Sequence, residues 1–328
     1  MRTILVTGGA GYVGSKLVSH LLDNNFKVKV YDTFWYGDQV FGDLRNCENI
    51  ELIRGDIRDL EKLNIAVAGC TDLIHLACIS NDPSYELDPK LGQEINFDCF
   101  LPLVNFAQNN GIQRFIYASS SSVYGVKEEE KVTEKLSLEP LTDYSKFKAK
   151  CEPILLEKSS NNFITTVVRP ATICGYSPRQ RLDLSVNILT NHAYNEKRIK
   201  VFGGQQYRPN LHIDDMCDAY ISILNQPPNL VNGEIFNVGA ENMKIIEIAN
   251  LVNKVVDYSA EISFDKTNDT RSYRVSSDYI HEKIGFLPKK SVLDAIQDLI
   301  EAFKLGRLPN SLTDAKYFNL KRMNQILN

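Results

Sequence analysis

Tyr144 and Lys148 are the two residues whose types and spacing best suit acid–base chemistry. They stand four residues apart in Asp143-Tyr-Ser-Lys-Phe-Lys148, so both side chains lie on one face of a predicted helix. A free tyrosine has a pKa of about 10 and is a poor base at neutral pH. A neighbouring ammonium group stabilises the phenolate and lowers that pKa, so the pair predicts a general base that removes a proton from a hydroxyl group. Such pairs are also common on helix surfaces, so the surrounding sequence must decide their role.

A glycine-rich loop near the start of the chain predicts a nucleotide cofactor. Gly8, Gly11 and Gly14 recur every third residue, after an apolar run and before a helical pattern. Glycine lets the backbone turn sharply and approach a pyrophosphate, whose charge then lies at the N-terminus of the following helix. Asp32 ends the next predicted strand, where a carboxylate accepts hydrogen bonds from a ribose diol and repels a 2′-phosphate. Together these features favour NAD over NADP. The positive nicotinamide ring of NAD⁺ would join the Lys148 ammonium in lowering the pKa of Tyr144.

Two further predicted strands end in residues that suit the same cofactor. Asp56 follows the strand at 50–54 and is expected to accept a hydrogen bond from the adenine amino group. Ala77 follows the strand at 71–76, where a small side chain would let the cofactor lie against the backbone. Open parallel sheets bind ligands at the carboxyl ends of their strands, so we expect both residues near the glycine loop.

Apolar runs and helical patterns alternate through the first half of the chain. Strands are predicted at 3–7, 27–31, 50–54, 71–76, 114–118 and 163–169, with helices at 15–24, 91–110 and 144–159. This alternation predicts an α/β fold with a Rossmann-type, doubly wound parallel sheet. After about residue 170 the alternation breaks, and helices are predicted near 182–195, 214–225 and 244–257. We therefore expect an NAD-binding domain over residues 1–170 and a smaller α/β substrate-binding domain over 171–328, with segments such as 211–240 returning to the sheet.

The composition argues against several classes of function. The chain has 328 residues, 43% hydrophobic and 24% charged, and its net charge of −4 predicts neither nucleic-acid nor membrane-surface binding. No apolar run approaches the roughly eighteen residues that cross a bilayer, and the first run reaches glycine too early for a signal peptide. Seven scattered cysteines indicate reduced thiols in a cytoplasmic protein. The five histidines do not cluster with them, so no metal site is predicted.

The chain resembles the extended short-chain dehydrogenases/reductases of the nucleotide-sugar epimerase/dehydratase family over nearly its whole length, and is UDP-glucose 4-epimerase-like. The resemblance rests on the glycine loop at 7–14, Gly-Asp-Ile-Arg-Asp at 55–59, His-Leu-Ala-Cys at 75–78, Asn96, the serine run with Val-Tyr-Gly at 119–125, Tyr-Ser-Lys-Phe-Lys at 144–148, Arg169-Pro170, the stretch 203–214 and Phe-Asn-Val-Gly at 236–239. It implies an NAD site formed by Gly8, Gly11, Tyr12, Val13, Asp32, Asp56, Ile57, Ala77, Tyr144, Lys148 and Pro170. It also implies a homodimer that pairs through the helices at about 91–110 and 144–159 in a four-helix bundle.

The resemblance also gives the serine run a role. It implies that Ser120 hydrogen-bonds the reacting hydroxyl, that Tyr144 takes its proton, and that Lys148 holds the nicotinamide ribose. Dehydratases of the family carry an Asp-Glu or similar pair at the next two positions, and decarboxylating relatives tend to carry a glutamate. This chain has Ser121 and Ser122, which are expected to bind the substrate. Serine has no usable pKa for removing a proton next to a ketone. Elimination is therefore disfavoured, and hydride chemistry at one carbon, most simply C4, is expected.

The diphosphate of a nucleotide sugar needs cationic partners. The resemblance assigns this role to Arg208, because a guanidinium fits phosphate with two parallel hydrogen bonds. The later Arg-Pro-Gly-Asp motif of the family is replaced at 266–271, where Lys266 or Arg271 is expected to substitute. Thr172 stands where many relatives have an asparagine that contacts the diphosphate, and Asn187 is expected to contact the nucleotide. The sequence leaves the base open, so the sugar is expected to be UDP- or GDP-linked.

We therefore expect an NAD-dependent nucleotide-sugar 4-epimerase that works through a 4-keto sugar. One alternative is a 4-dehydrogenase that releases the ketone, as some family members do with GDP-heptoses. Another is a catalytically silent nucleotide-binding relative, which the intact set of Ser120, Tyr144 and Lys148 argues against.

Overall fold

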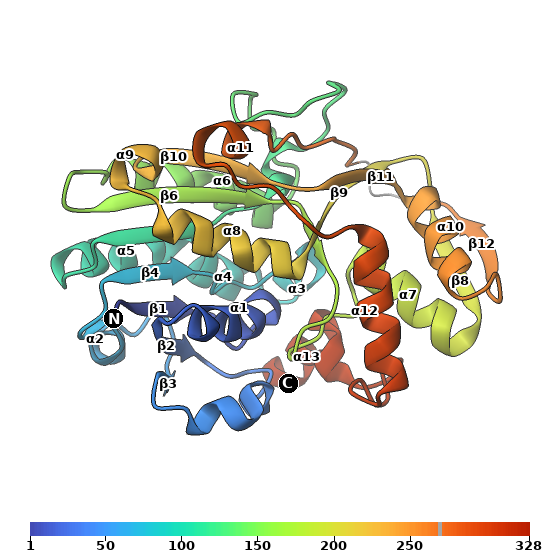
Figure 1. Cartoon of the computed structure of the whole chain (residues 1–328), viewed down its shortest axis with the longest axis horizontal. Coiled ribbons are helices and arrows are strands. Elements are labelled where there is room, and N and C mark those ends of the chain that lie inside the picture. Colours follow the sequence, from blue (N-terminus) through green and yellow to red (C-terminus); the bar gives the residue numbers. More distant parts are fainter. Residues whose placement is uncertain (268–270) are drawn as a thin grey trace.

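A parallel seven-stranded sheet forms the centre of the computed structural model, which describes residues 1–267 and 271–328 (Figure 1). Its strands are β1 (Thr3–Thr7), β2 (Lys27–Asp32), β3 (Ile50–Arg54), β4 (Asp72–His75), β5 (Arg114–Ala118), β6 (Ile164–Pro170) and β10 (Glu234–Val238). They lie in the order β10-β6-β5-β4-β1-β2-β3, and each neighbouring pair is parallel. The chain builds outward from β1 to β3 and then crosses to β4, so the point where the strand order reverses lies between β1 and β4. The predicted fold class is confirmed.

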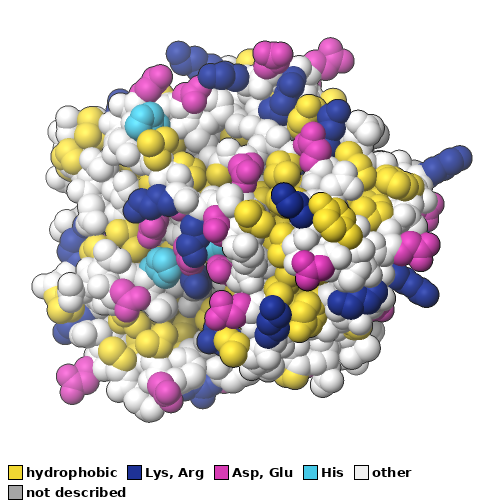
Figure 2. Space-filling model, turned by 45° about the vertical axis from the view of Figure 1, so that its right-hand side comes forward, with side chains coloured by type: hydrophobic (Ala, Val, Ile, Leu, Met, Phe, Trp, Pro, Cys, Tyr) yellow, Lys and Arg dark blue, Asp and Glu magenta, His cyan; other side chains and the backbone are white. Residues whose placement is uncertain are grey.

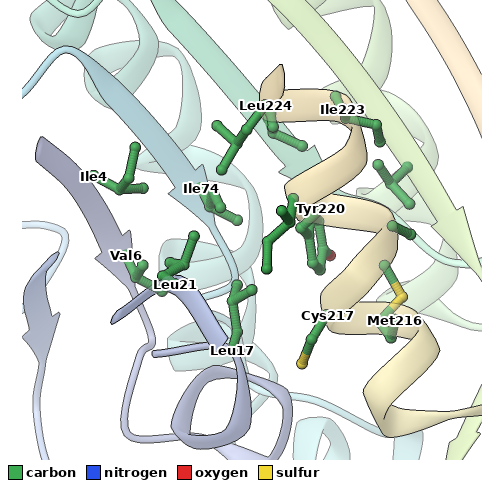
Figure 3. Close-up of a cluster of buried hydrophobic side chains, with 14 of the residues drawn as sticks. Ile4, Val6, Leu17, Leu21, Ile74, Met216, Cys217, Tyr220, Ile223 and Leu224 are labelled. Atoms are coloured by element: carbon green, nitrogen blue, oxygen red, sulfur yellow. The ribbon is translucent and has the colours of Figure 1, made fainter. Parts of the chain in front are cut away.

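Helices cover both faces of this sheet. One face carries α1 (Tyr12–Asp23) and α8 (Ile213–Asn225), and the other carries α2 (Leu60–Val67), α5 (Phe100–Asn109) and α6 (Asp143–Leu156). Figure 3 shows side chains of α1 and α8 converging on Ile4 and Val6 of β1 and on Ile74 of β4. Leu5 points to the opposite face, because successive strand residues alternate between the two sides. Apolar residues on both sides explain why β1 has a continuous hydrophobic sequence.

A smaller group of elements lies beyond the carboxyl ends of the central strands (Figure 1). It contains a three-stranded sheet of β7 (Thr172–Cys174), β9 (Tyr207–His212) and β11 (Glu241–Lys244), and a parallel pair of β8 (Arg198–Phe202) and β12 (Glu261–Asp265). Its helices α7 (Ser185–Glu196), α10 (Ile245–Val255) and α12 (Val292–Lys304) share one hydrophobic cluster. Shorter helices complete the chain: α3 (Asp82–Glu86), α4 (Pro89–Gln93), α9 (Pro228–Val231), α11 (Asp278–Ile284) and α13 (Asn319–Leu327).

Two helices differ from their predicted bounds in ways that bear on function. α1 begins at Tyr12, three residues earlier than predicted, because Gly11 is already its N-cap. The predicted helix at 91–110 is broken into α4, a π-helical turn at Glu94–Asp98, and α5. Asn96 lies in that turn and bonds Ile79 twice, with its amide oxygen 2.8 Å from the backbone nitrogen and its amide nitrogen 3.0 Å from the carbonyl oxygen. The turn therefore fixes the loop that follows β4.

The helices and the surface charges indicate whether the protein could cross a membrane or bind nucleic acid. Among the described residues, none of the helices combines the length and the apolar character that crossing a bilayer requires. The face drawn in Figure 2 carries acidic and basic side chains close together, while hydrophobic side chains gather toward its right-hand side. This face therefore offers no broad basic surface of the kind that binds a phosphate backbone.

Candidate active site

A cavity of about 570 Å³ opens at the carboxyl ends of the central strands. All the residues predicted to bind the cofactor lie in its lining: Gly8, Gly11, Tyr12, Val13, Asp32, Asp56, Ile57, Ala77, Tyr144, Lys148 and Pro170. The lining also contains Ser120 and five of the residues predicted to bind substrate: Ser121, Ser122, Thr172, Arg208 and Arg271. The fold thus brings together side chains from distant parts of the sequence, at the edge where open α/β sheets bind ligands.

The glycine loop is shaped by close backbone contacts. Gly8 has φ +74°, and a β-carbon there would lie 2.6 Å from the backbone nitrogen of Ala77. A β-carbon at Gly14 would collide with the carbonyl oxygen of Gly8. The loop therefore presents bare backbone at the N-terminus of the twelve-residue helix α1, in the wall of the cavity. This arrangement fits the diphosphate of a dinucleotide such as NAD.

Asp32 and Asp56 are both held by donors of the chain. Asp32 accepts hydrogen bonds from the backbone nitrogens of Ala10, at 2.9 Å, and Phe34, at 2.7 Å. Burial raises its pKa, although these bonds oppose the rise, and its oxygens retain lone pairs for ribose hydroxyls. Burial also acts on Asp56, but the hydrogen bonds from Arg58 outweigh it and lower the pKa of that carboxyl. The predicted adenine contact of Asp56 therefore involves a carboxylate that already forms an ion pair with Arg58 at 2.8 Å.

Helix α6 presents Tyr144 and Lys148 to the cavity. A capping box between Thr142 and Ser145 sets the start of this helix, so local sequence fixes where the two side chains fall. Lys148 is 3% exposed, and its Nζ donates to the carbonyl oxygen of Ala118 at 2.6 Å. The same Nζ lies 6.0 Å from the centre of the Tyr144 ring. The ammonium group is thus fixed near the phenol by the end of β5.

Burial is the main influence on the pKa of Tyr144 in the protein without its cofactor. Burial raises the pKa of this phenol above its ordinary value, and a hydrogen bond with Ser120 offsets part of the rise. The expected lowering of this pKa depends on the Lys148 ammonium together with a positive nicotinamide ring, and without that ring removal from water outweighs the other effects. A Tyr144 base would need the positive charge of an oxidised nicotinamide beside it.

The serine run forms a fixed edge of the cavity. Ser120 caps the 3₁₀ turn Ser121–Tyr124, and its Oγ accepts from the backbone nitrogen of Ser122 at 3.1 Å. The Oγ atoms of Ser120 and Ser122 lie 2.9 Å apart, and Ser121 Oγ lies 3.4 Å from the hydroxyl of Tyr273. Neither position after Ser120 therefore carries a carboxylate or an amine that could act as a base.

A buried ion pair between Glu152 and Arg169 supports this edge of the cavity. Ser119 Oγ donates to Glu152 Oε1 at 2.5 Å, and Arg169 donates to both oxygens of the same carboxylate at 3.0 and 2.6 Å. The hydrogen bonds to Glu152 outweigh burial and raise the pKa of Arg169. The network joins the end of β5, which Ser120 follows, to β6 and to α6, which carries Tyr144 and Lys148.

Two residues predicted to contact substrate, Asn187 and Lys266, lie outside the cavity lining. Asn187 is fully buried outside the lining, with its amide oxygen bonded to the Gly175 nitrogen at 3.0 Å and its amide nitrogen bonded to the Tyr12 hydroxyl at 3.1 Å. Both the oxygen and the nitrogen of the amide thus form hydrogen bonds within the protein. Lys266 lies outside the lining and is exposed, so Arg271 alone of the two reaches the cavity. Part of the predicted stretch 266–271 lies outside the described residues, at 268–270.

The lining also contains a group of charged residues that the sequence patterns did not predict. Arg179, Arg181 and Asp183 come from the loop at 175–184, and Asp82 begins α3. Arg179 lies over the ring of Tyr36 at 3.7 Å from its centre, and burial lowers the pKa of this guanidinium to about 10. The sequence feature that could have indicated this group is the pair of arginines in Pro-Arg-Gln-Arg at 178–181, which lies between two apolar runs. Nothing in the local sequence marked Asn319, which also lines the cavity.

The comparison with a family model gives a match over residues 4–239. This model describes the NAD dependent epimerase/dehydratase family. The matched segment covers well over half of the chain, from β1 to the residue after β10, and contains the glycine loop and the candidate catalytic residues.

Individual proteins agree with this match. An uncharacterised UDP-glucose epimerase of Bacillus subtilis, YtcB, is 31% identical over 80% of this chain and 84% of its own length. A dTDP-glucose 4,6-dehydratase of Streptomyces niveus is 25% identical over 93% of each chain. The crystal structure of a UDP-glucuronic acid 4-epimerase from Bacillus cereus, in complex with UDP-glucuronic acid and NAD, superimposes with a TM-score of 0.83 and 26% identity, covering 93% of this chain and 99% of the other.

Proposed function

Because the chain belongs to the NAD dependent epimerase/dehydratase family, we propose that it epimerises C4 of a nucleotide-diphosphate sugar through a transient 4-keto sugar. The family resemblance inferred from the sequence is confirmed, and the chain is an NAD-dependent enzyme of this family. The observation that carries the finer proposal is the cavity edge, where Ser120, Tyr144 and Lys148 meet while serines occupy both positions after Ser120.

The proposed mechanism assigns one task to each side chain. NAD, when bound, supplies an acceptor and donor of hydride. Tyr144 takes the proton of the C4 hydroxyl as the hydride leaves the same carbon, which turns the alcohol into a ketone. Ser120 holds the reacting oxygen by a hydrogen bond, and Lys148 stabilises the phenolate by its positive charge. The 4-keto sugar then turns over in the cavity, so that the hydride returns to the opposite face of C4 and, with the proton from Tyr144, gives the epimer.

Dehydration is disfavoured because each of the four carboxylates that the structure describes in the lining accepts hydrogen bonds from an arginine or from the backbone through at least one oxygen. Asp32 accepts two backbone hydrogen bonds and Asp56 pairs with Arg58. Asp183 pairs with Arg181 at 2.8 Å, and Asp82 pairs with Arg271 at 3.0 Å. An ion-paired carboxylate is a weak base for a carbon-bound proton.

The closest alternative is a 4-dehydrogenase that releases the 4-keto sugar, for example from a GDP-heptose. It uses the same three catalytic residues and differs only in whether the hydride returns to the sugar. The observation that favours it is the position of the half-buried Tyr144 beside the buried Lys148 ammonium, which suits one-way oxidation as well as epimerisation.

We further propose that Arg208 and Arg271 bind the substrate diphosphate, with Thr172 beside them in the lining. The nucleotide is proposed to be UDP or GDP; the B. cereus relative was solved with UDP-glucuronic acid. The protein is also proposed to form a homodimer through α5 and α6, which pack against each other on one face of the sheet.

Product analysis in deuterated water tests the proposal. The purified protein, supplied with NAD⁺, is incubated with UDP-glucose, GDP-mannose or a GDP-heptose, and the products are followed by proton NMR. Epimerisation keeps the original hydrogen on C4, because the hydride returns within the site, and the Tyr144→Phe variant stays folded and inactive. Elimination would instead place solvent deuterium on carbon, and a net dehydrogenase would accumulate ketone and reduced cofactor. Either outcome, or an active Tyr144→Phe variant, would refute the proposed reaction.

A further inference from the structure

Four side chains of the cavity lining carry buried polar atoms that have no partner among the described residues. The atoms are Asp82 Oδ1, Arg179 Nε, Arg181 Nη2 and Ser185 Oγ. A buried polar group without a hydrogen bond is costly and uncommon in native proteins. Unpaired atoms that gather in one cavity therefore indicate where a polar ligand would complete the bonding.

Asp82 and Arg181 lie at the end of the cavity where the reaction is proposed. The charge of Asp82 raises the pKa of the Tyr144 phenol, and the charge of Arg181 lowers it, so both groups are within electrostatic reach of that side chain. Arg179 lies elsewhere, over the ring of Tyr36 and close enough to Asp32 to affect its pKa. Helix α3, which begins with Asp82, packs against α6, the helix that carries Tyr144, with the ring centres of Tyr85 and Phe147 6.0 Å apart. Asp82 and Arg181 therefore line the cavity near Tyr144, and Arg181 also lies near Tyr36, on the side of Arg179.

Each of the two groups is anchored so that one atom remains available. Arg181 donates its Nε to Asp183 Oδ1 at 2.8 Å and leaves Nη2 without a partner. Asp82 accepts at Oδ2 from Arg271 at 3.0 Å and leaves Oδ1 without a partner. Asn81 ties the two loops together, with its Nδ2 3.4 Å from the other oxygen of Asp183. The wall thus offers one fixed acceptor and one fixed donor.

A neutral hydroxyl group matches this wall better than a carboxylate. A hydroxyl can donate to Asp82 Oδ1 and accept from Arg181 Nη2, whereas a carboxylate can only accept and would be repelled by Asp82. The exocyclic carbon on C5 neighbours the proposed reacting carbon. It is also the position at which hexoses and uronic acids differ.

We propose that Asp82 and Arg181 form a subsite for a hydroxyl on the exocyclic carbon of the sugar, which selects neutral hexoses or longer polyhydroxylated sugars over uronic acids. The inference rests on the proposed function. It sets this chain apart from the B. cereus relative, whose structure contains UDP-glucuronic acid.

Three matched ligands and one isosteric variant test the subsite. Dissociation constants of the NAD-loaded protein are measured by calorimetry for UDP-glucose, UDP-glucuronic acid and UDP-xylose, which carry a hydroxymethyl group, a carboxylate and no exocyclic carbon. The GDP-linked mannose, mannuronic acid and lyxose form a second series. We expect the hydroxymethyl sugar of the accepted series to bind about tenfold more tightly than either of its analogues, as one hydrogen bond to a charged group implies.

Asp82→Asn should reduce this preference, because it removes the charge that repels a carboxylate and weakens acceptance of the hydroxyl proton. Arg181→Lys keeps the positive charge but loses the paired N–H donors of the guanidinium, so it should weaken binding of the hydroxymethyl sugar. This variant provides the test if Asp82→Asn fails to fold. Asp23→Asn, an equal change of charge at an exposed position outside the lining, is the control and should leave all affinities unchanged. Equal affinities for all three sugars of the accepted series would overturn the proposed subsite but not the proposed function. An unaltered preference in both variants would do the same. No binding in either series would overturn the proposed function as well.

Discussion

The backbone of Gly8, at the end of β1, lies directly against the backbone of Ala77, which follows β4. A β-carbon on Gly8 would stand 2.6 Å from the nitrogen and 2.7 Å from the α-carbon of Ala77. The two strands flank the point where the strand order reverses, so this contact brings the glycine loop against the loop after β4. Both residues line the cavity.

Gly8→Ala should therefore lower the free energy of unfolding by more than an ordinary replacement of glycine by alanine. The new methyl group would meet backbone atoms that cannot move aside, in addition to the strain of a positive φ. Gly285→Ala is the matched control, because Gly285 has the same φ of +74° and open space where its β-carbon would stand. We expect a loss of about 1 kcal/mol in unfolding free energy for the control and at least about 2 kcal/mol for Gly8→Ala, measured by denaturant unfolding. Equal losses would show that the close contact is unimportant.

His75 should make stability depend on pH. Burial, aided by the charge of Lys148, lowers the pKa of this imidazole to about 3. In the unfolded chain the value is about 6.5, so the folded state binds the proton less tightly. The stabilisation is present above pH 6.5 and is lost as the pH falls toward 3, by about 2 kcal/mol between pH 6.5 and 5. His75→Gln should flatten the pH profile of the unfolding free energy over this range, and an identical profile in the variant would contradict the assignment.

Local patterns predicted the sheet, and all the residues predicted to bind the cofactor lie in the cavity lining. Strands such as β1 follow from apolar runs that are buried on both faces, and the start of α6 follows from a capping box that places Tyr144 and Lys148. Because parallel strands end at one edge, residues that follow them must meet there. This geometric rule explains why the glycine loop, Asp32 and Ala77 could be assigned to one site from sequence alone.

The remaining features depend on contacts that sequence patterns do not encode. Asn187 looked like a contact for the nucleotide, but a polar residue on a helix does not reveal that its amide is bonded within the fold. The loop with Arg179 and Arg181 has no periodicity, and the Tyr12 hydroxyl, which donates to the carbonyl oxygen of Gly175 at 2.7 Å, holds it against α1. The raised pKa of Tyr144 likewise follows from burial, which only the folded chain determines.

The buried pair of Glu152 and Arg169 should be essential for stability. Both side chains are 3% exposed, so Glu152→Gln would leave the Arg169 guanidinium without a counter-charge in the interior. Removing one partner of such a pair costs about 3–5 kcal/mol of unfolding free energy. Glu51→Gln provides the same substitution in the half-exposed pair with Lys29, where a loss below about 1 kcal/mol is expected. Chemical denaturation of both variants measures the difference, and similar losses would argue against the role of the buried pair.

Asn319 should slow the release of the bound cofactor. This residue begins α13 and joins two loops of the cavity wall: its Nδ2 donates to Ser80 Oγ at 2.8 Å, its backbone nitrogen donates to Asp183 at 2.9 Å, and its Oδ1 accepts from Arg179. Asn319→Ala removes the side-chain hydrogen bonds, and we expect NAD(H) to dissociate about tenfold faster, as the loss of one or two hydrogen bonds implies.

Two measurements test this prediction. The protein is denatured after purification and the released NAD⁺ and NADH are quantified per chain, and dissociation is followed by fluorescence of the reduced cofactor. Asn324→Ala, at an exposed position on the same helix, should retain the cofactor as the unaltered protein does. If Asn319→Ala also retains it, α13 contributes to the fold without closing the site.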